Sequence, residues 1–319
     1  INCRLQIFPQ QMLLLMLMCV DARKIVKKIV KHKKIQHVRR APKQYVPPPA
    51  ELFQIENPSR FKVSYLIPVF NQARFIEGCI QNILQQDHGN FEIVIVDDKS
   101  TDESVEIVKR LQLQRPEIVL YQQPHNKGTL LARLKLMELF SGDYAIFVDA
   151  DDYFTQTNVV GQCLAKSVLQ EADICAISFA HFHLSDGHIG FINHKQLKNN
   201  IYNTMSSVSS YNKAKFKIPY FHHIWCYLYT KQILKQTLKE TQDVVKTTHM
   251  VYKEDNYLVR VIAMLGKKIV VQEQVGFYHV QHDGQVTKVL QHNPKYKTDK
   301  ETLRRLIQQT PILNGKKEL

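Results

Sequence analysis

Apolar runs of strand length alternate with helical patterns in the first half of the chain, and no other feature limits the fold as strongly. The run FEIVIV is typical of a strand buried on both faces of a parallel sheet. Ser100 and Glu103 then form a capping-box pattern, which predicts a helix through Leu113. The apolar runs are FKVSYLIPVF (61–70), FEIVIV (91–96), EIVLY (117–121) and DYAIFV (143–148). We therefore expect an α/β fold with a mainly parallel sheet flanked by helices.

Polar residues follow three of these runs directly. They are Asn71 after the first run, Asp97 and Asp98 after the second, and Asp149, Asp151 and Asp152 after the fourth. Ligands of such sheets bind where the strands end, so we expect these side chains to line one site. The dinucleotide fingerprint GxGxxG and the phosphate loop GxxxxGK[ST] are both absent from the sequence. Their absence disfavours a plain Rossmann oxidoreductase and a P-loop NTPase.

The aspartates after the fourth run form an Asp-x-Asp motif. Like charges this close raise one another's pKa, so the cluster needs a positive partner. Asp149 and Asp151 are two positions apart and can project from the same side, where their oxygens suit Mg²⁺ or Mn²⁺. A calcium loop of the EF-hand type fails, because Val160 stands where the loop needs its final glutamate. An Asp-rich turn that caps the next helix is the open alternative.

Four segments then occur in a characteristic order and spacing. They are VSYLIPVFNQARFIEGCIQNILQQ, FEIVIVDDKSTDES, NKGTLLAR and YAIFVDADD. Together they resemble the family-2 glycosyltransferases, inverting enzymes of the Rossmann-like GT-A fold that use nucleotide-diphosphate sugars. The resemblance covers residues 61–155 strongly and continues more loosely to about 287. It implies a nucleotide-sugar half over 61–165 and a smaller acceptor-side half, carrying the catalytic base, over 166–290.

The resemblance also implies roles on the donor side. Asp149 and Asp151 would hold Mn²⁺ or Mg²⁺ against the two phosphates, and Asp97 or Asp98 would read the base, with uracil expected. Arg133 would supply positive charge near the diphosphate, whereas the residue pattern alone favours a helix-surface ion pair for it. The remaining donor-side residues implied by the resemblance are Pro68, Val69, Asn71 and Gly128.

The second half contains a candidate for the base in YKEDNYLVRVI, residues 252–262. Glu254 and Asp255 match the family's Glu-Asp pair before an apolar helix, in which the aspartate takes the proton of the acceptor hydroxyl. The alternative is an acidic first turn favoured by the helix dipole. Trp225 is either an acceptor-sugar platform or a core residue. Near the C-terminus Val280 replaces the family's arginine, and a histidine, His279 or His282, would have to make the phosphate contact instead.

The net charge of +14 is concentrated at the two ends of the chain. Residues 23–43 carry ten Lys or Arg and no acid, whereas the stretch 44–287 is close to neutral. This distribution argues against nucleic acid as a partner, and it leaves contact with an anionic membrane surface open for residues 23–43. Six cysteines without regular spacing predict neither a disulfide framework nor a zinc site.

The two ends also look like targeting signals. Residues 1–22 contain a short apolar run before Val20-Asp21-Ala22, which predicts a signal peptide or else a short apolar N-terminus. The last four residues, KKEL, are similar to the Lys-Asp-Glu-Leu retrieval signal. We therefore expect a resident of the ER lumen, with a cytoplasmic protein as the alternative. The basic, proline-rich stretch 23–60 is expected to be a stem or linker, and 291–319 a basic C-terminal tail.

The leading hypothesis is a metal-dependent, inverting transfer of a sugar from a UDP-sugar to an acceptor hydroxyl on a glycan, protein or lipid. The first alternative is a non-catalytic member of the same fold that binds nucleotide-sugar or glycan. A sugar-nucleotide nucleotidyltransferase ranks last, because it normally has a glycine-rich loop after the first strand, and IPVFNQAR contains no glycine.

Overall fold

The computed structural model describes residues 60–185, 187–191, 202–203, 223–246, 248–283, 285 and 293–314. Residues 55–319 form one compact unit. The expected signal peptide 1–22, the stem 23–60 apart from Arg60, and the KKEL end lie outside the described residues. Among the described residues, no helix combines the length and apolar character that crossing a membrane requires.

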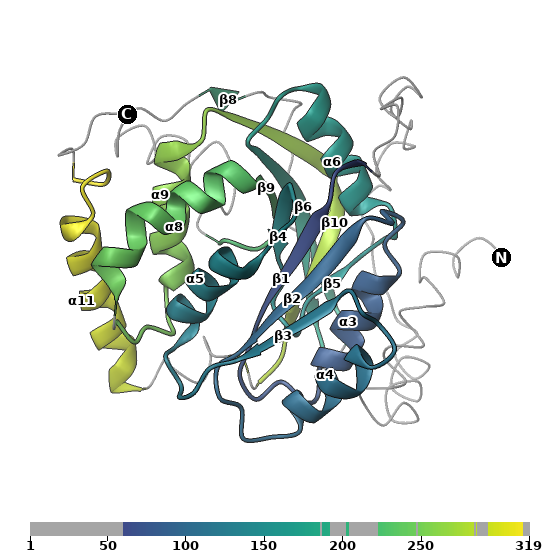
Figure 1. Ribbon diagram of the computed structural model, residues 1–319, viewed down its shortest axis with the longest axis horizontal. Coiled ribbons are helices and arrows are strands. Elements are labelled where there is room, and N and C mark those ends of the chain that lie inside the picture. Colours follow the sequence, from purple (N-terminus) through teal and green to yellow (C-terminus); the bar gives the residue numbers. More distant parts are fainter. Residues whose placement is uncertain are drawn as a thin grey trace, which may run out of the picture. The chain divides into compact units, whose positions relative to one another are not determined.

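One sheet runs through the whole described unit (Figure 1). Its strand order is β3-β2-β1-β4-β9-β6-β10-β5, with β7 paired to β6 and β8 paired to β10. The strands are β1 (Val63–Val69), β2 (Phe91–Asp97), β3 (Ile118–Gln122), β4 (Tyr144–Phe147), β5 (Tyr153–Phe154), β6 (Ile174–His183), β7 (Ile189–Phe191), β8 (Tyr202–Asn203), β9 (Tyr227–Thr230) and β10 (Lys268–Gln281). The four apolar runs of the sequence are β1 to β4, so the expected strands all form.

Strand direction differs between the two halves of this sheet. β1 pairs in parallel with β2 and β4, and β2 pairs in parallel with β3, as the βαβ pattern predicts. β9 is antiparallel to both β4 and β6, and β10 is parallel to β6. The α/β class is therefore confirmed. Parallel pairing dominates only in the first half of the sheet, and the sheet is continuous across the boundary expected at residue 165.

Helices cover both faces of the sheet, with α3, α4 and α6 on one side and α5, α8 and α9 on the other (Figure 1). They are α3 (Ile76–Leu84), α4 (Ser104–Gln112), α5 (Thr129–Leu139), α6 (Val159–Leu169), α8 (Lys231–Val245), α9 (Glu254–Leu265) and α11 (Pro294–Gln309). In α3 the buried residues Ile76, Cys79, Ile80 and Ile83 follow the helical repeat. That spacing turns one apolar stripe of the helix toward the sheet.

The start of α4 differs from the capping-box expectation. The helix begins at Ser104, and the Asp102 carboxylate accepts the Ser104 N–H at 3.0 Å. The Ser100 hydroxyl instead accepts the Asn71 N–H at 2.9 Å and thereby joins the loops after β1 and β2. The Ser100–Glu103 prediction was therefore wrong, because the serine found a partner on a distant segment of the chain.

The C-terminal segment 291–319 also differs from the basic tail that was expected. It contains α11, which packs against α8 and α9 and buries Leu306 completely. The Tyr257 hydroxyl on α9 makes a 2.7 Å hydrogen bond with the Thr310 hydroxyl just beyond α11. Much of the segment therefore belongs to the folded unit, and it braces the helix that carries Glu254 and Asp255.

Candidate active site

The aspartates after β4 each have a positive or ionisable partner within the protein. The Asp151 carboxylate lies 2.8 Å from His282 Nε2. Asp152 is fully buried, lies 3.2 Å from His279 Nδ1 and accepts the Val280 N–H at 2.9 Å. Burial lowers the pKa of His279, but the Asp152 carboxylate outweighs this effect and raises it to about 9. The protein itself therefore supplies part of the positive charge that the acidic cluster requires.

Arg133 connects the acidic cluster to the second half of the chain. Its Nη2 donates to Asp149 Oδ1 at 2.9 Å, and its Nε donates to Glu254 Oε1 at 3.3 Å. The side chain is only 4% exposed, so these contacts are shielded from solvent. Burial lowers the pKa of Arg133, but the two carboxylates outweigh burial and raise it. This is a buried bridge between α5, the β4 edge and α9, not the helix-surface ion pair that the residue pattern alone favours.

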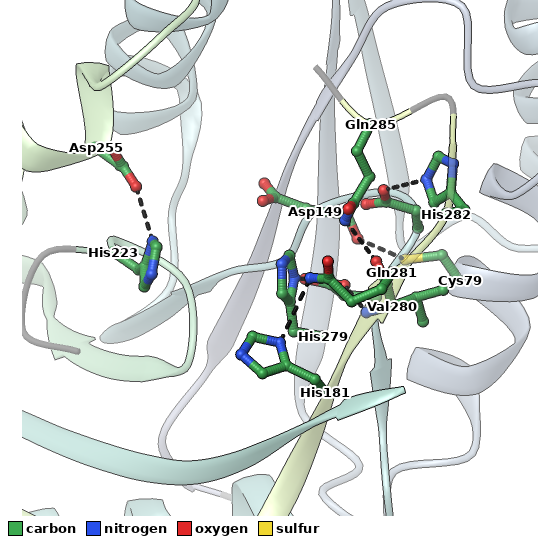
Figure 2. A network of polar contacts seen from close by, with 12 residues as sticks. Cys79, Asp149, His181, His223, Asp255, His279, Val280, Gln281, His282 and Gln285 are labelled. Atoms are coloured by element: carbon green, nitrogen blue, oxygen red, sulfur yellow. Dashed lines mark hydrogen bonds and ion pairs between the residues drawn. The ribbon is translucent and has the colours of Figure 1, made fainter. Parts of the chain in front are cut away.

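One nitrogen of Arg133 remains unused by the described residues. Its Nη1 is buried and has no hydrogen-bond acceptor among them. Buried N–H groups without a partner are rare in folded proteins, so the atom calls for an acceptor beyond the described residues. In the view of Figure 2, the carboxylate of its neighbour Asp149 lies between the Asp255–His223 pair and the His279–His282 group.

Glu254 and Asp255 have opposite electrostatic environments although they are adjacent. Burial and then the charge of Asp255 raise the pKa of Glu254, despite its contact with Arg133. Burial would also raise the pKa of Asp255, but a hydrogen bond and the charge of His223 outweigh it and lower that pKa. His223 Nδ1 lies 3.1 Å from Asp255 Oδ2 (Figure 2). The pair therefore contains one carboxylate that stays ionised and one that takes up a proton readily.

An aromatic stack holds His223 in place. Its ring stacks on Trp225 with centroids 4.6 Å apart and planes 21° apart. Trp225 also stacks on His279, with centroids 4.8 Å apart and planes 18° apart. The tryptophan is 3% exposed, so it is a core residue and offers no free face to an acceptor sugar. The stack connects the histidine beside Asp255 to the histidine beside Asp152.

The aspartates that end β2 hold two neighbouring loops. Asp97 accepts the Ser100 N–H at 3.1 Å. Asp98 accepts the N–H of Lys127 at 2.7 Å and that of Gly128 at 2.8 Å. Gly128 has φ +85°, and an added Cβ would lie 2.8 Å from the Met250 carbonyl oxygen. Both conditions require glycine there, because the segment after β3 packs directly against the loop that leads into α9.

The residues at the end of β1 lie beside this loop system. Val69 is buried and Pro68 is half-buried, whereas Asn71 is exposed. Asn71 has φ +53°, and its side-chain oxygen accepts the Thr101 N–H at 2.8 Å. The sheet therefore brings the expected donor-side residues to its carboxyl edge, while their contacts with a nucleotide remain a prediction.

The described residues by themselves do not complete the donor set of a metal ion. In the part of the chain that the structure describes, no group of three or more His, Cys, Asp or Glu side chains is arranged to hold a metal. Asp151 and His282 offer an oxygen and a nitrogen within 2.8 Å of each other, a pair that suits Mn²⁺. Mg²⁺ and Mn²⁺ sites often add water and substrate phosphate oxygens to one or two protein ligands. The residues therefore fit a cation shared with a diphosphate.

Sequence reasoning missed His223 and the Arg133–Glu254 contact. His223 belongs to no recognised motif in the sequence. Arg133 and Glu254 are 121 positions apart. Each has a local explanation in the sequence, a helix-surface ion pair for Arg133 and an acidic first helical turn for Glu254. No signal in one sequence connects them, so only the folded chain reveals the bridge.

Comparison with known proteins supports the family. The family described as "Glycosyl transferase family 2" matches residues 64–256, more than half of the chain. The chain belongs to this family. This family-2 chain is 29% identical over 212 residues to the glycosyltransferase GlyA of Streptococcus pneumoniae, a match covering 66% of this chain and 29% of GlyA. It is 31% identical over 122 residues to TuaG of Bacillus subtilis, a putative teichuronic acid biosynthesis glycosyltransferase, covering 38% of this chain and 47% of TuaG.

Solved structures support the same fold. The S. aureus TarS fragment 1–349 in complex with UDP-GlcNAc superposes with a TM-score of 0.59 at 18% identity, covering 79% of this chain and 70% of that one. Identity this low supports the fold alone. The family-2 chain also spans less than half the length of GlyA and of TuaG.

The expected address in the ER lumen was wrong. GlyA and TuaG are bacterial proteins, and bacteria have no endoplasmic reticulum. The similarity of KKEL to a retrieval signal, together with the signal-like N-terminus, had carried that expectation. A short lysine-rich end matches such a signal easily, because four residues contain little information.

Proposed function

We propose that this family-2 chain transfers a sugar from a UDP-sugar to an acceptor hydroxyl, with inversion and with the help of a divalent cation. The observation that carries the proposal is the buried Arg133 bridge, 2.9 Å from Asp149 and 3.3 Å from Glu254. This bridge brings the Asp-x-Asp motif next to the helix that carries the candidate base. A transfer reaction needs these two groups at one place, because bond formation and departure of the diphosphate occur on the same sugar carbon.

Asp255 is the proposed general base. Its lowered pKa keeps the carboxylate ionised near neutral pH, and its Oδ2 faces His223 at the edge of the site. The carboxylate takes the proton of the acceptor hydroxyl while the oxygen attacks the anomeric carbon. The bond from that carbon to the diphosphate breaks, UDP leaves with the bonding electrons, and the configuration of the carbon inverts. Glu254, whose pKa is raised, is a positioning residue that holds Arg133.

Asp149, Asp151 and Arg133 form the proposed diphosphate side. Asp151, with His282 beside it, and Asp149 would hold Mn²⁺ or Mg²⁺, while Arg133 stays on Asp149 Oδ1. When bound, the cation would stabilise the negative charge that develops on the departing diphosphate. The buried and unpaired Nη1 of Arg133 would donate to an oxygen of the donor. This donation explains why a buried N–H is left without a partner among the described residues.

The nucleotide would lie along the loops after β1, β2 and β3. Pro68, Val69 and Asn71 would line its pocket, and Asp97 would read the base. Asp98 would act through Lys127 and Gly128, whose N–H groups it already holds. The UDP-GlcNAc complex of TarS, which shares this fold, supports a UDP-sugar as the donor class. The acceptor is a hydroxyl on a glycan, protein or lipid.

UDP release from a panel of UDP-sugars with Mn²⁺ tests the proposal. We expect Asp151→Ala and Asp255→Asn to lower turnover at least a hundredfold, while Asp255→Asn still binds UDP. Asp243→Asn is the matched control, because that exposed carboxylate on α8 lies outside the site. The proton NMR spectrum of the first product formed would report inversion at the anomeric carbon. Equal turnover in the wild type and both site variants would refute the assignment, and UDP binding without turnover would favour the non-catalytic alternative.

A further inference from the structure

The loop before α9 is fastened to α11, beyond the range that the family match covers. The fully buried Asp299 accepts the backbone N–H of Val251 at 3.2 Å and that of Tyr252 at 3.0 Å. Lys295 pairs with the same carboxylate at 3.1 Å, so its charge is balanced locally. The family match ends at residue 256, whereas Asp299 lies in the C-terminal helix. The position of the loop beside the proposed base therefore depends on a residue outside the matched region.

This attachment brings two tyrosines and two lysines together. The rings of Tyr252 and Tyr296 are in tilted contact, with centroids 4.4 Å and planes 31° apart, and the Tyr252 hydroxyl donates to the Tyr296 hydroxyl at 3.2 Å. Lys300 Nζ lies 4.0 Å from the Tyr296 ring centroid, and Lys253 Nζ lies 5.7 Å from that of Tyr252. All four side chains are half-buried. We call these four residues the Tyr–Lys cluster.

The Tyr–Lys cluster is suited to an anion. Lys300 lies over the Tyr296 ring and Lys253 lies near the Tyr252 ring. No acidic side chain is paired with either ammonium group among the described salt bridges. Because Tyr252 donates to Tyr296, the proton of the Tyr296 hydroxyl is directed away from Tyr252 and can reach an outside acceptor. Ammonium groups and a hydroxyl donor are the groups that bind phosphate oxygens in proteins.

The cluster also lies next to the proposed base. Lys253 directly precedes Glu254 and Asp255, the first two residues of α9. Its φ of +64° is in the left-handed region, which a long side chain adopts only when the surrounding structure holds it there. Only Glu254 separates Lys253 from Asp255 in the chain. A group bound by Lys253 would therefore lie close to the acceptor hydroxyl that Asp255 deprotonates.

We propose that the Tyr–Lys cluster binds a phosphate ester carried by the acceptor, close to the hydroxyl that receives the sugar. This inference rests on the proposed function, because an acceptor presupposes transfer. The two lysines neutralise the phosphate, the Tyr296 hydroxyl donates to it, and Asp299 holds the loop in the receiving position. The occupant is a soluble or polymer-borne phosphate ester and not a lipid bilayer.

A ³¹P NMR titration tests this site in the presence of saturating UDP and Mg²⁺, which keep the donor side filled. The probe is glycerol 3-phosphate, and glycerol followed by its proton signals is the neutral comparison. We expect Lys253→Gln combined with Lys300→Gln to weaken glycerol 3-phosphate binding at least tenfold. The matched control combines Lys109→Gln on α4 with Lys239→Gln on α8, which removes the same charge elsewhere and should bind the probe like the wild type.

Three outcomes would overturn the proposal. They are equal probe binding by the wild type and the cluster variant, an equal loss in the control variant, and cluster-dependent binding to phosphatidylglycerol vesicles without binding of the probe. The titration is repeated without UDP. If the chain binds the probe there but does not bind UDP, the result counts against the proposed function and not against the phosphate site. The Tyr296→Phe variant tests the hydroxyl separately from the ring. It keeps the ring contact with Tyr252 and should still lose probe affinity.

Discussion

Replacing His223 by alanine should move the acidic limb of the pH–rate profile toward higher pH. In the folded protein His223 Nδ1 lies 3.1 Å from Asp255 Oδ2, and this contact lowers the pKa of Asp255. A base works only when it is ionised, so activity falls as the pH drops through its pKa. Without His223, burial still raises the pKa of Asp255, and only the Arg133 charge and the Asn256 N–H oppose it, so that pKa rises.

The size of the shift follows from the contact. A hydrogen bond to a charged group contributes about 1.5–3 kcal/mol, and one pKa unit corresponds to about 1.36 kcal/mol. The acidic limb should therefore move up by about 1–2 pH units. The Asp255 side chain is 19% exposed, so solvent screens the interaction only in part.

The assay is UDP release with the donor and acceptor at saturation, measured from acid to neutral pH. His223→Asn is the matched variant, because its amide N–H can still donate to Asp255, and it should recover part of the shift. A purely structural role of His223 would lower turnover equally at every pH. An acidic limb in His223→Ala that coincides with the wild-type limb would refute this reasoning.

Three further predictions concern stability, measured by urea unfolding. Gly128→Ala should destabilise by about 1–3 kcal/mol, because φ is +85° and the new Cβ would lie 2.8 Å from the Met250 oxygen; Gly89→Ala, with open space around it, should change little. Arg133→Met should cost about 3–5 kcal/mol by leaving the buried Glu254 carboxyl group and the partly exposed Asp149 carboxylate unpaired, and an unchanged midpoint would contradict the buried bridge. Burial would raise the pKa of Glu92, but its hydrogen bonds lower it from 4.5 to about 2, so about 3 kcal/mol of stability is present above pH 4.5 and disappears toward pH 2. Glu92→Gln should flatten that dependence.

The strands of the first half were predictable because their signal is local. A continuous apolar run such as Phe91–Asp97 has few alternatives once helical patterns flank it on both sides. The same pattern predicted that the polar residues lie at the carboxyl edge of the sheet. The antiparallel insertion of β9 between β4 and β6 was not predictable, since strand order depends on contacts between residues far apart in the sequence.

For the acidic cluster, the sequence predicted that a counter-charge is needed but not which groups supply it. The sequence correctly required a positive partner for Asp149, Asp151 and Asp152. It pointed to a divalent cation, whereas the folded chain also supplies Arg133 and His282. Those partners come from α5 and from the end of β10, so the identity of the counter-charges depended on the fold.

The amino-acid sequence by itself determined the α/β class, the edge of the sheet where the polar side chains gather, and the family motifs, because each is encoded within a few neighbouring residues. Only the tertiary structure decided which groups meet at that edge. His223 reaches Asp255 through a stack on Trp225, and Asp299 on α11 holds the loop before α9. Contacts of this kind join segments far apart in the chain, and only packing of the whole unit sets their distances.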